Sequence, residues 1–151
     1  MKEGIQIVRA ESAHLDELAP LFDLYRQFYG QSSNEAAARE YLEQRMHAAE
    51  SVVFIAMENG RGVGFTQLYP TFSSISIKRS LILNDLFVHS DFRRRGIAEK
   101  LLHAAKSYAI ETGAKALSLS TASDNESAQR LYESFGFEKD TSFFHYDLLV
   151  N

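Results

Sequence analysis

The chain has 151 residues, of which 45% are hydrophobic and 12% aromatic, and its formal net charge is −4. This length can bury a sizeable core, and we expect one domain over residues 1–151. Because the chain has no cysteine, it has neither a disulfide framework nor a thiol nucleophile. The acidic balance argues against general nucleic-acid affinity. No stretch approaches the roughly 20 apolar residues of a membrane span. Without an apolar signal region, we expect a cytoplasmic location.

The first third of the chain predicts a strand followed by two helices. Residues 5–8 have the pattern of a short strand. Ser12 is placed to cap a first helix that carries an apolar and aromatic face, and Pro20 is expected to distort this helix. Ser32 and Glu35 have capping-box spacing, which predicts the start of a second amphipathic helix.

The middle of the chain predicts antiparallel strands. Residues 52–58 and 62–69 form a hairpin around a turn at Asn59–Gly60. Residues 70–74 are expected to be a loop. Residues 75–88 have the composition of a strand whose middle is interrupted.

The last third predicts alternating helices and strands. A helix over residues 96–112 that stops at Gly113 is followed by a buried strand over 117–121. Asp124 or Asn125 is placed to cap a short helix that ends at Gly136. Phe137 and the run FFHYDLLV, residues 143–150, are expected to supply two closing strands. Because a strand–helix–strand unit requires parallel pairing and hairpins require antiparallel pairing, the fold class is α/β with a mixed sheet and about four helices.

The most informative segment is LILNDLFVHSDFRRRGIA, in which an apolar strand ends in a polar turn and a helix follows. Backbone N–H groups at a helix N-terminus lack intrahelical partners and lie at the positive end of the helix dipole, so they bind anions such as a diphosphate. The residues that would form this anion site are Arg93, Arg94, Arg95, Gly96, Ile97 and Ala98.

A second motif follows in the segment DNESAQRLYESFGF. It contains the pattern Asn-x-x-Ala-x-x-Leu-Tyr-x-x-x-Gly-Phe, with Asn125 at its start and Tyr132 at its tyrosine. Arg-x-x-Gly-x-Ala after a strand, followed by this second pattern, resembles the two signatures of the GNAT superfamily of acyl-CoA-dependent N-acyltransferases. The resemblance covers nearly the whole chain and implies a sheet splayed at its central parallel strands.

The resemblance also implies a reaction. Acetyl-CoA would donate its acetyl group directly to an amine, without an acyl-enzyme and without a metal. Backbone groups of Leu86, Phe87 and Val88, together with Asn125, would contact the CoA chain, and Tyr132 would protonate the leaving thiolate. A helix cap for Asn125 and a partly buried helix aromatic for Tyr132 are the competing structural interpretations.

The general base is left open by the sequence. The loop segment most resembles spermidine/spermine acetyltransferases, whose strand carboxylate is replaced here by Asn84. An amide does not titrate near neutral pH but can hold a water, so a water on Asn84 is our first candidate. Asp85 and His145 are the alternatives. Strand alternation points Asp85 to the opposite face unless a bulge intervenes.

The acceptor is the least determined feature. By resemblance, aromatic residues of the first helix and of the loop after the hairpin would line its pocket: Tyr25, Phe28, Tyr29, Tyr69 and Phe72. Small amines, amino acids and peptide lysines all stay open. The run FFHYDLLV is apolar enough either to pair with a second copy in a homodimer or to form an inner strand.

Two further hypotheses belong to other functional classes. A non-catalytic acyl-CoA sensor would explain the missing carboxylate at Asn84. A nucleic-acid contact through Arg93 to Arg95 would give strongly salt-dependent binding. It ranks last because the net charge is negative.

Overall fold

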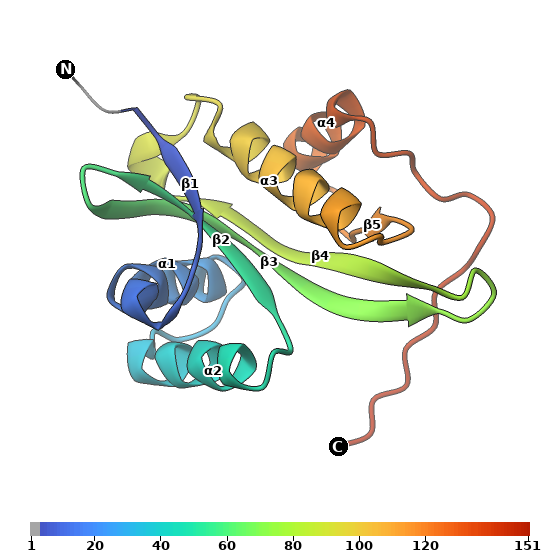
Figure 1. Cartoon of the computed structure of the whole chain (residues 1–151), viewed down its shortest axis with the longest axis horizontal. Coiled ribbons are helices and arrows are strands. Elements are labelled where there is room, and N and C mark those ends of the chain that lie inside the picture. Colours follow the sequence, from blue (N-terminus) through green and yellow to red (C-terminus); the bar gives the residue numbers. More distant parts are fainter. Residues whose placement is uncertain (1–3) are drawn as a thin grey trace. The chain divides into compact units, whose positions relative to one another are not determined.

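The computed structural model describes residues 4–151, which divide after Ser120 into two compact units. The first unit contains a five-stranded sheet in the order β1-β2-β3-β4-β5 (Figure 1). Its strands are β1 (Gln6–Arg9), β2 (Val52–Glu58), β3 (Arg61–Ser73), β4 (Lys78–Val88) and β5 (Leu117–Ser118). All neighbours are antiparallel except β4 and β5, so the predicted mixed sheet with its parallel pair is confirmed.

Three α-helices cover the two faces of this sheet: α1 (Leu15–Phe28), α2 (Glu35–His47) and α3 (Ile97–Glu111). α1 and α2 lie on one face and α3 on the other (Figure 1). Because side chains alternate along a strand, Ile55 packs into a core with Leu18 and Leu42. Its neighbour Ala56 packs with Leu101 on the α3 face. No helix within residues 4–151 is long and apolar enough to cross a membrane.

Both N-terminal helices begin differently from the sequence expectation. Ser12 does not cap α1 but opens a short 3-10 turn (Ser12–His14), and Glu11 and His14 form the capping box there. The cap of α2 is Asn34, whose side chain accepts a hydrogen bond from the Ala37 N–H at 3.1 Å, so the predicted box from Ser32 is wrong. Asn34 directly precedes the first helical residue, where a side-chain oxygen reaches the unpaired N–H groups.

The strands around the second hairpin are longer than predicted. β3 continues through Pro70 to Ser73, because these residues pair with the start of β4, from Pro70↔Leu81 to Ser73↔Lys78. The expected loop over residues 70–74 is therefore mostly strand, and the reversal falls at Ser74–Ile77. The turn Asn59–Gly60 and the helix break at Gly113 agree with the sequence.

The predicted interruption of the 75–88 strand is a β-bulge. Gln67 of β3 pairs with Asp85, whereas the next residue, Leu68, pairs with Leu83. Asn84 is thus the extra residue of β4. A bulge changes the side-chain alternation locally. Because of this bulge, the Asn84 and Asp85 side chains can lie on the same face of the sheet.

The close approach of β3 and β4 beyond this bulge requires a glycine. A Cβ added to Gly64 would lie 2.9 Å from the Phe87 carbonyl oxygen. We expect Gly64→Ala to lower the unfolding free energy by about 1–3 kcal/mol, because backbone on two paired strands would have to move. Chemical denaturation measures this change. Gly4→Ala is the control, because its Cβ meets open space; an equal loss in both variants would contradict the explanation.

The second unit, residues 121–151, contains α4 (Glu126–Phe135). The Asn125 side chain accepts a hydrogen bond from the Ala128 N–H at 3.2 Å, and Gly136 ends the helix with φ 122°, both as predicted.

The closing strands expected at Phe137 and over residues 143–150 are wrong. This segment is irregular and its apolar side chains are exposed, including Phe144 at 90%. A strand exists only where its backbone pairs with a neighbour, and this segment enters no ladder. The expected buried strand over 117–121 is likewise reduced to the two residues of β5, neither of them buried.

Candidate active site

The segment after β4 leads into the start of α3, where backbone N–H groups have no helical partners. It passes through a 3-10 turn (Ser90–Phe92) and then reaches α3. Arg94 and Gly96 both have positive φ, at 64° and 75°. The Lys100 N–H donates to the Gly96 carbonyl at 3.1 Å and so starts the helical ladder. The N–H groups of the first turn of α3 precede this ladder and have no partner within the helix.

The three arginines of this loop have different roles. Arg95 makes two hydrogen bonds to the Glu58 carboxylate, at 2.6 and 3.2 Å, which tie the loop to β2. The Arg93 Nε donates to the Val88 carbonyl at 3.0 Å. Within residues 4–151, Arg94 enters no ion pair. Arg93 and Arg95 therefore hold the loop in shape, and Arg94 is the guanidinium left to meet a ligand.

The end of β4 has an open side. Leu86, Phe87 and Val88 pair with β3, but β5 pairs with β4 only at Leu81 and Ile82. Beyond Ile82, the described ladder between β4 and β5 stops while β4 continues to Val88. This is the opening that the predicted splay requires, and it precedes the loop predicted to bind an anion.

A cavity of about 550 Å³ lies on the α1–α2 side of β4. Aromatic and polar side chains from α1, α2, β3 and the bulge form its walls: Phe22, Tyr25, Arg26, Tyr29, Gln31, Ala37, Ala38, Tyr41, Tyr69, Asn84 and Asp85. Small-molecule sites are typically apolar hollows with a few convergent polar groups. This cavity has that character.

Asp85 is the buried charged group of this cavity, with 3% of its surface exposed. Its carboxylate accepts hydrogen bonds from the Gln67 Nε2 at 2.6 Å and from the Asn84 Nδ2 at 3.0 Å. The Tyr25 hydroxyl donates to the Asn84 carbonyl at 3.4 Å. The bulge thus places the amide of Asn84 against the carboxylate rather than on the opposite face.

Burial raises the pKa of the Asp85 carboxyl above its usual value, and the hydrogen bonds from Gln67, Tyr25 and Asn84 offset this effect only in part. Desolvation disfavours the charged form of a carboxyl group. A carboxyl whose pKa is moved toward neutrality is suited to accept a proton in catalysis.

The structure brings together three of the five predicted acceptor residues. Tyr25, Tyr29 and Tyr69 line the cavity. Phe28 and Phe72 do not, and both are largely exposed, at 63% and 70%.

Six of the eleven wall residues were not predicted from the sequence: Phe22, Arg26, Gln31, Ala37, Ala38 and Tyr41. The Tyr41 and Tyr69 hydroxyls share a hydrogen bond of 2.7 Å. Burial and this hydrogen bond raise the pKa of Tyr69. Only the packing of α1 and α2 reveals these walls, because no local motif marks them.

Three predicted residues belong to the second unit. Tyr132 lies in α4, with its ring 5.8 Å from that of Phe137. Asn125 caps the same helix. His145 is exposed in the irregular C-terminal segment.

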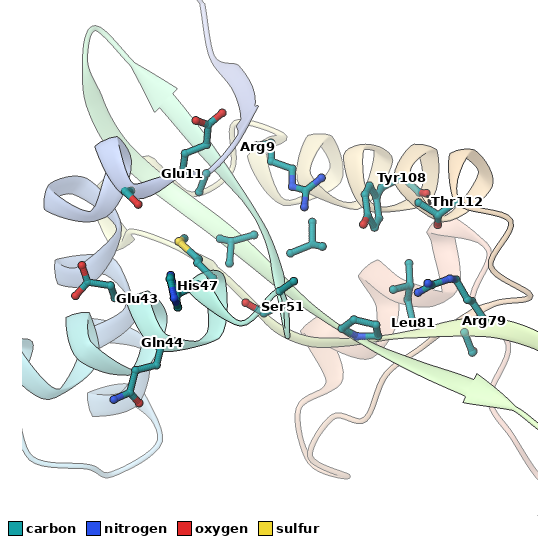
Figure 2. Close-up of a pocket in the computed structure, with 18 residues that line it drawn as sticks. Arg9, Glu11, Glu43, Gln44, His47, Ser51, Arg79, Leu81, Tyr108 and Thr112 are labelled. Atoms are coloured by element: carbon teal, nitrogen blue, oxygen red, sulfur yellow. Dashed lines mark hydrogen bonds between the residues drawn. The ribbon is translucent and has the colours of Figure 1, made fainter.

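A larger cavity, of about 1360 Å³, lies at the other end of the sheet (Figure 2). Its labelled residues include Arg9 beside Tyr108 and, across the cavity, His47 and Glu43 of α2 (Figure 2). It lies where β4 begins, whereas the anion-binding loop follows the end of β4. We therefore place the site at the smaller cavity, where a buried carboxyl group and the open strand edge occur together.

Comparison with known proteins identifies the family of this chain. Residues 18–137 match the family model of the acetyltransferase (GNAT) family. The chain is 50% identical to the uncharacterized N-acetyltransferase YhfO of Bacillus subtilis, over 97% of this chain and 98% of that protein. The chain belongs to the GNAT family.

Solved GNAT structures share the fold. A probable acetyltransferase, 47% identical, superposes with a TM-score of 0.92 and covers 97% of this chain and 98% of its own. An aminoglycoside N-acetyltransferase in complex with CoA is 22% identical and has a TM-score of 0.80, over 98% of this chain and 97% of its own. At this identity the two proteins share the fold. The protein is thus an N-acetyltransferase, and GNAT enzymes use acetyl-CoA.

Proposed function

We propose that this protein transfers an acetyl group from acetyl-CoA directly to a primary amine of a small molecule, amino acid or peptide, through a ternary complex. The transfer would be carried out in the cytoplasm by one domain over residues 1–151. The observation that carries the proposal is the buried Asp85 carboxyl group in an aromatic cavity beside the open edge of β4.

The loop before α3 fits the cofactor. Acetyl-CoA supplies an activated thioester and carries a diphosphate. The N–H groups from Arg94 to Ala98 and the Arg94 side chain would hold the diphosphate, and the backbone of Leu86–Val88 would hold the pantetheine chain. Asn125 is proposed as a further contact.

The acid–base chemistry divides between two side chains. Asp85 accepts the proton that the amine loses as its nitrogen forms the new C–N bond. Tyr132 donates a proton to the sulfur as the C–S bond breaks. Asn84, our first candidate for the base through a held water, takes a positioning role instead, because its Nδ2 already donates to Asp85.

The experiment that tests this function combines cofactor binding with turnover. We expect acetyl-CoA to raise the melting temperature of the protein. We also expect the protein to acetylate members of a panel of amines, amino acids and peptides, with mass spectrometry as the readout of acetylation. Acetyl-CoA at about 100 times its Kd stabilises by about 2.7 kcal/mol. We expect Gly96→Ala to weaken acetyl-CoA binding by about tenfold or more, because a Cβ would enter the loop that the diphosphate approaches.

Gly113→Ala is the matched control for this loop. Gly113 has nearly the same positive φ, 73° against 75°, and both glycines have open space around the Cβ position. Both variants should therefore lose similar stability, by about 1 kcal/mol, but only Gly96→Ala should lose acetyl-CoA affinity. Equal cofactor affinity in the two variants would contradict the placement, and no acetylation of any acceptor at saturating acetyl-CoA would overturn the function.

A further inference from the structure

The cavity of about 550 Å³ beside Asp85 is called the acceptor cavity below. The charged residues that line it form a simple pattern. Of its described wall residues, Asp85 and Arg26 carry formal charge. Asp85 is 3% exposed, whereas Arg26 on α1 is only partly buried. The negative charge therefore lies in the interior of the wall and the positive charge nearer to solvent.

The Arg26 side chain is not committed to an ion pair. Within residues 4–151 it enters none of the salt bridges. Its acidic neighbour on α1, Asp23, already accepts hydrogen bonds from the Ser33 hydroxyl at 2.7 Å and from the Asn34 N–H at 2.8 Å. The Arg26 charge interacts with Asp23 and lowers the pKa of that carboxyl group, but the guanidinium forms no ion pair and keeps its planar fork of donors for an anionic group.

A second guanidinium, on α2, is already paired. Arg45 stacks on the Tyr41 ring at 4.9 Å and pairs with Glu50 at 2.9 Å. The remaining walls are mostly aromatic, so they contribute shape rather than net charge. Among the described wall residues, Asp85 is the one that carries a carboxylate for an ammonium group.

We propose that the acceptor is a small amino carboxylate: one primary amine, directed to Asp85, and one carboxylate, held by Arg26. This rests on the proposed function, because it names the substrate class of the same site. A carboxylate at Arg26 forms a charge-assisted hydrogen bond, whereas a second ammonium there is repelled. Polyamines and aminoglycosides, which carry several ammonium groups, are accordingly poor acceptors, although an aminoglycoside N-acetyltransferase shares the fold.

Matched acceptors of equal chain length test this assignment. We would measure kcat/KM with 4-aminobutyrate, butylamine and 1,4-diaminobutane, and with α-amino acids against their amides. In the wild type we expect the best carboxylate-bearing acceptor to exceed its matched amide or diamine by about 10- to 100-fold. Arg26→Glu should reverse the order in favour of the diamine, and Arg26→Gln should abolish the preference.

Arg39→Gln is the control, because Arg39 pairs with Asp16 on the surface and does not line the cavity; it should keep the wild-type preference. A wild type that favours diamines, or an Arg26→Glu variant with an unchanged order, overturns the inference while acetyl transfer still stands. The same compounds are also titrated without turnover, in the presence of CoA. Carboxylate-dependent binding without acetylation would support the acceptor class and refute the function, whereas neither binding nor acetylation would refute both.

Discussion

Asp85→Asn is expected to reduce kcat by about 10²–10⁴-fold while leaving acetyl-CoA affinity unchanged, because it removes the group that takes the proton from the amine. The substitution keeps the size of the side chain and its ability to accept a hydrogen bond from Gln67. Steady-state kinetics together with acetyl-CoA titration separates the two effects. Wild-type turnover in this variant would exclude Asp85 as the base.

The same variant should be more stable than the wild type at neutral pH. Burial raises the pKa of Asp85 in the folded state, so the folded protein holds this proton more tightly than the unfolded chain does. Stability contributed by this group is therefore present at low pH and is lost as the pH rises from the usual aspartate range through the folded-state pKa. Because asparagine carries no charge to bury, the melting temperature of the Asp85→Asn variant should not fall over this pH range.

Asp23 provides a control of opposite sign. Burial raises the pKa of Asp23, but the hydrogen bonds from Asn34, Ser33 and Gln27, together with the Arg26 charge, outweigh this effect and the pKa is lowered. Its contribution is present above the usual aspartate pKa and is lost as the pH falls through the folded-state value. Asp23→Asn should therefore destabilise at neutral pH. A loss of stability in both variants would contradict the account of Asp85.

Tyr132→Phe is expected to lower kcat by about 10²-fold, with little change in acetyl-CoA affinity. We expect the low end of the range for acid catalysis because a thiolate, whose conjugate acid has a pKa of about 8.5, leaves without obligatory protonation. The phenylalanine ring preserves the contact with Phe137 at 5.8 Å, so stability should change little.

Tyr108→Phe is the comparison for Tyr132→Phe. Tyr108 lies in α3, beside Phe54 and beneath the Arg9 guanidinium, and does not line the acceptor cavity. Its turnover should stay within about twofold of the wild type, as is usual for substitutions away from a site. Unchanged turnover in both variants would assign Tyr132 a packing role only.

The parts of the fold that depend on local signals could be predicted. The Asn125 cap, the turn at Asn59–Gly60 and the helix break at Gly113 are all recognised from a few adjacent residues, and the structure has them all. Helix α3 agrees within one residue at each end, because its Gly96 start and Gly113 stop are equally local.

The exact position of the bulge, several cavity walls and the path of the C-terminal run could not be fixed from the sequence, because they depend on partners distant along the chain. The bulge at Asn84 arises from the register between β3 and β4, which neither strand encodes alone. Tyr41 and Arg26 become wall residues only when α1 packs on α2. The run at residues 143–150 has the composition of a strand, but composition does not supply a pairing edge.

The bulge has a consequence for how such enzymes diverge. Two adjacent residues, Asn84 and Asp85, line the cavity, while Leu83 and Leu86 on either side of them stay paired with β3. Substitutions at these two positions can therefore change the base, its partner or the charge offered to a substrate without disturbing the register of the strand. Gene duplicates could thus acquire new acceptors through very few mutations while retaining the cofactor loop unchanged.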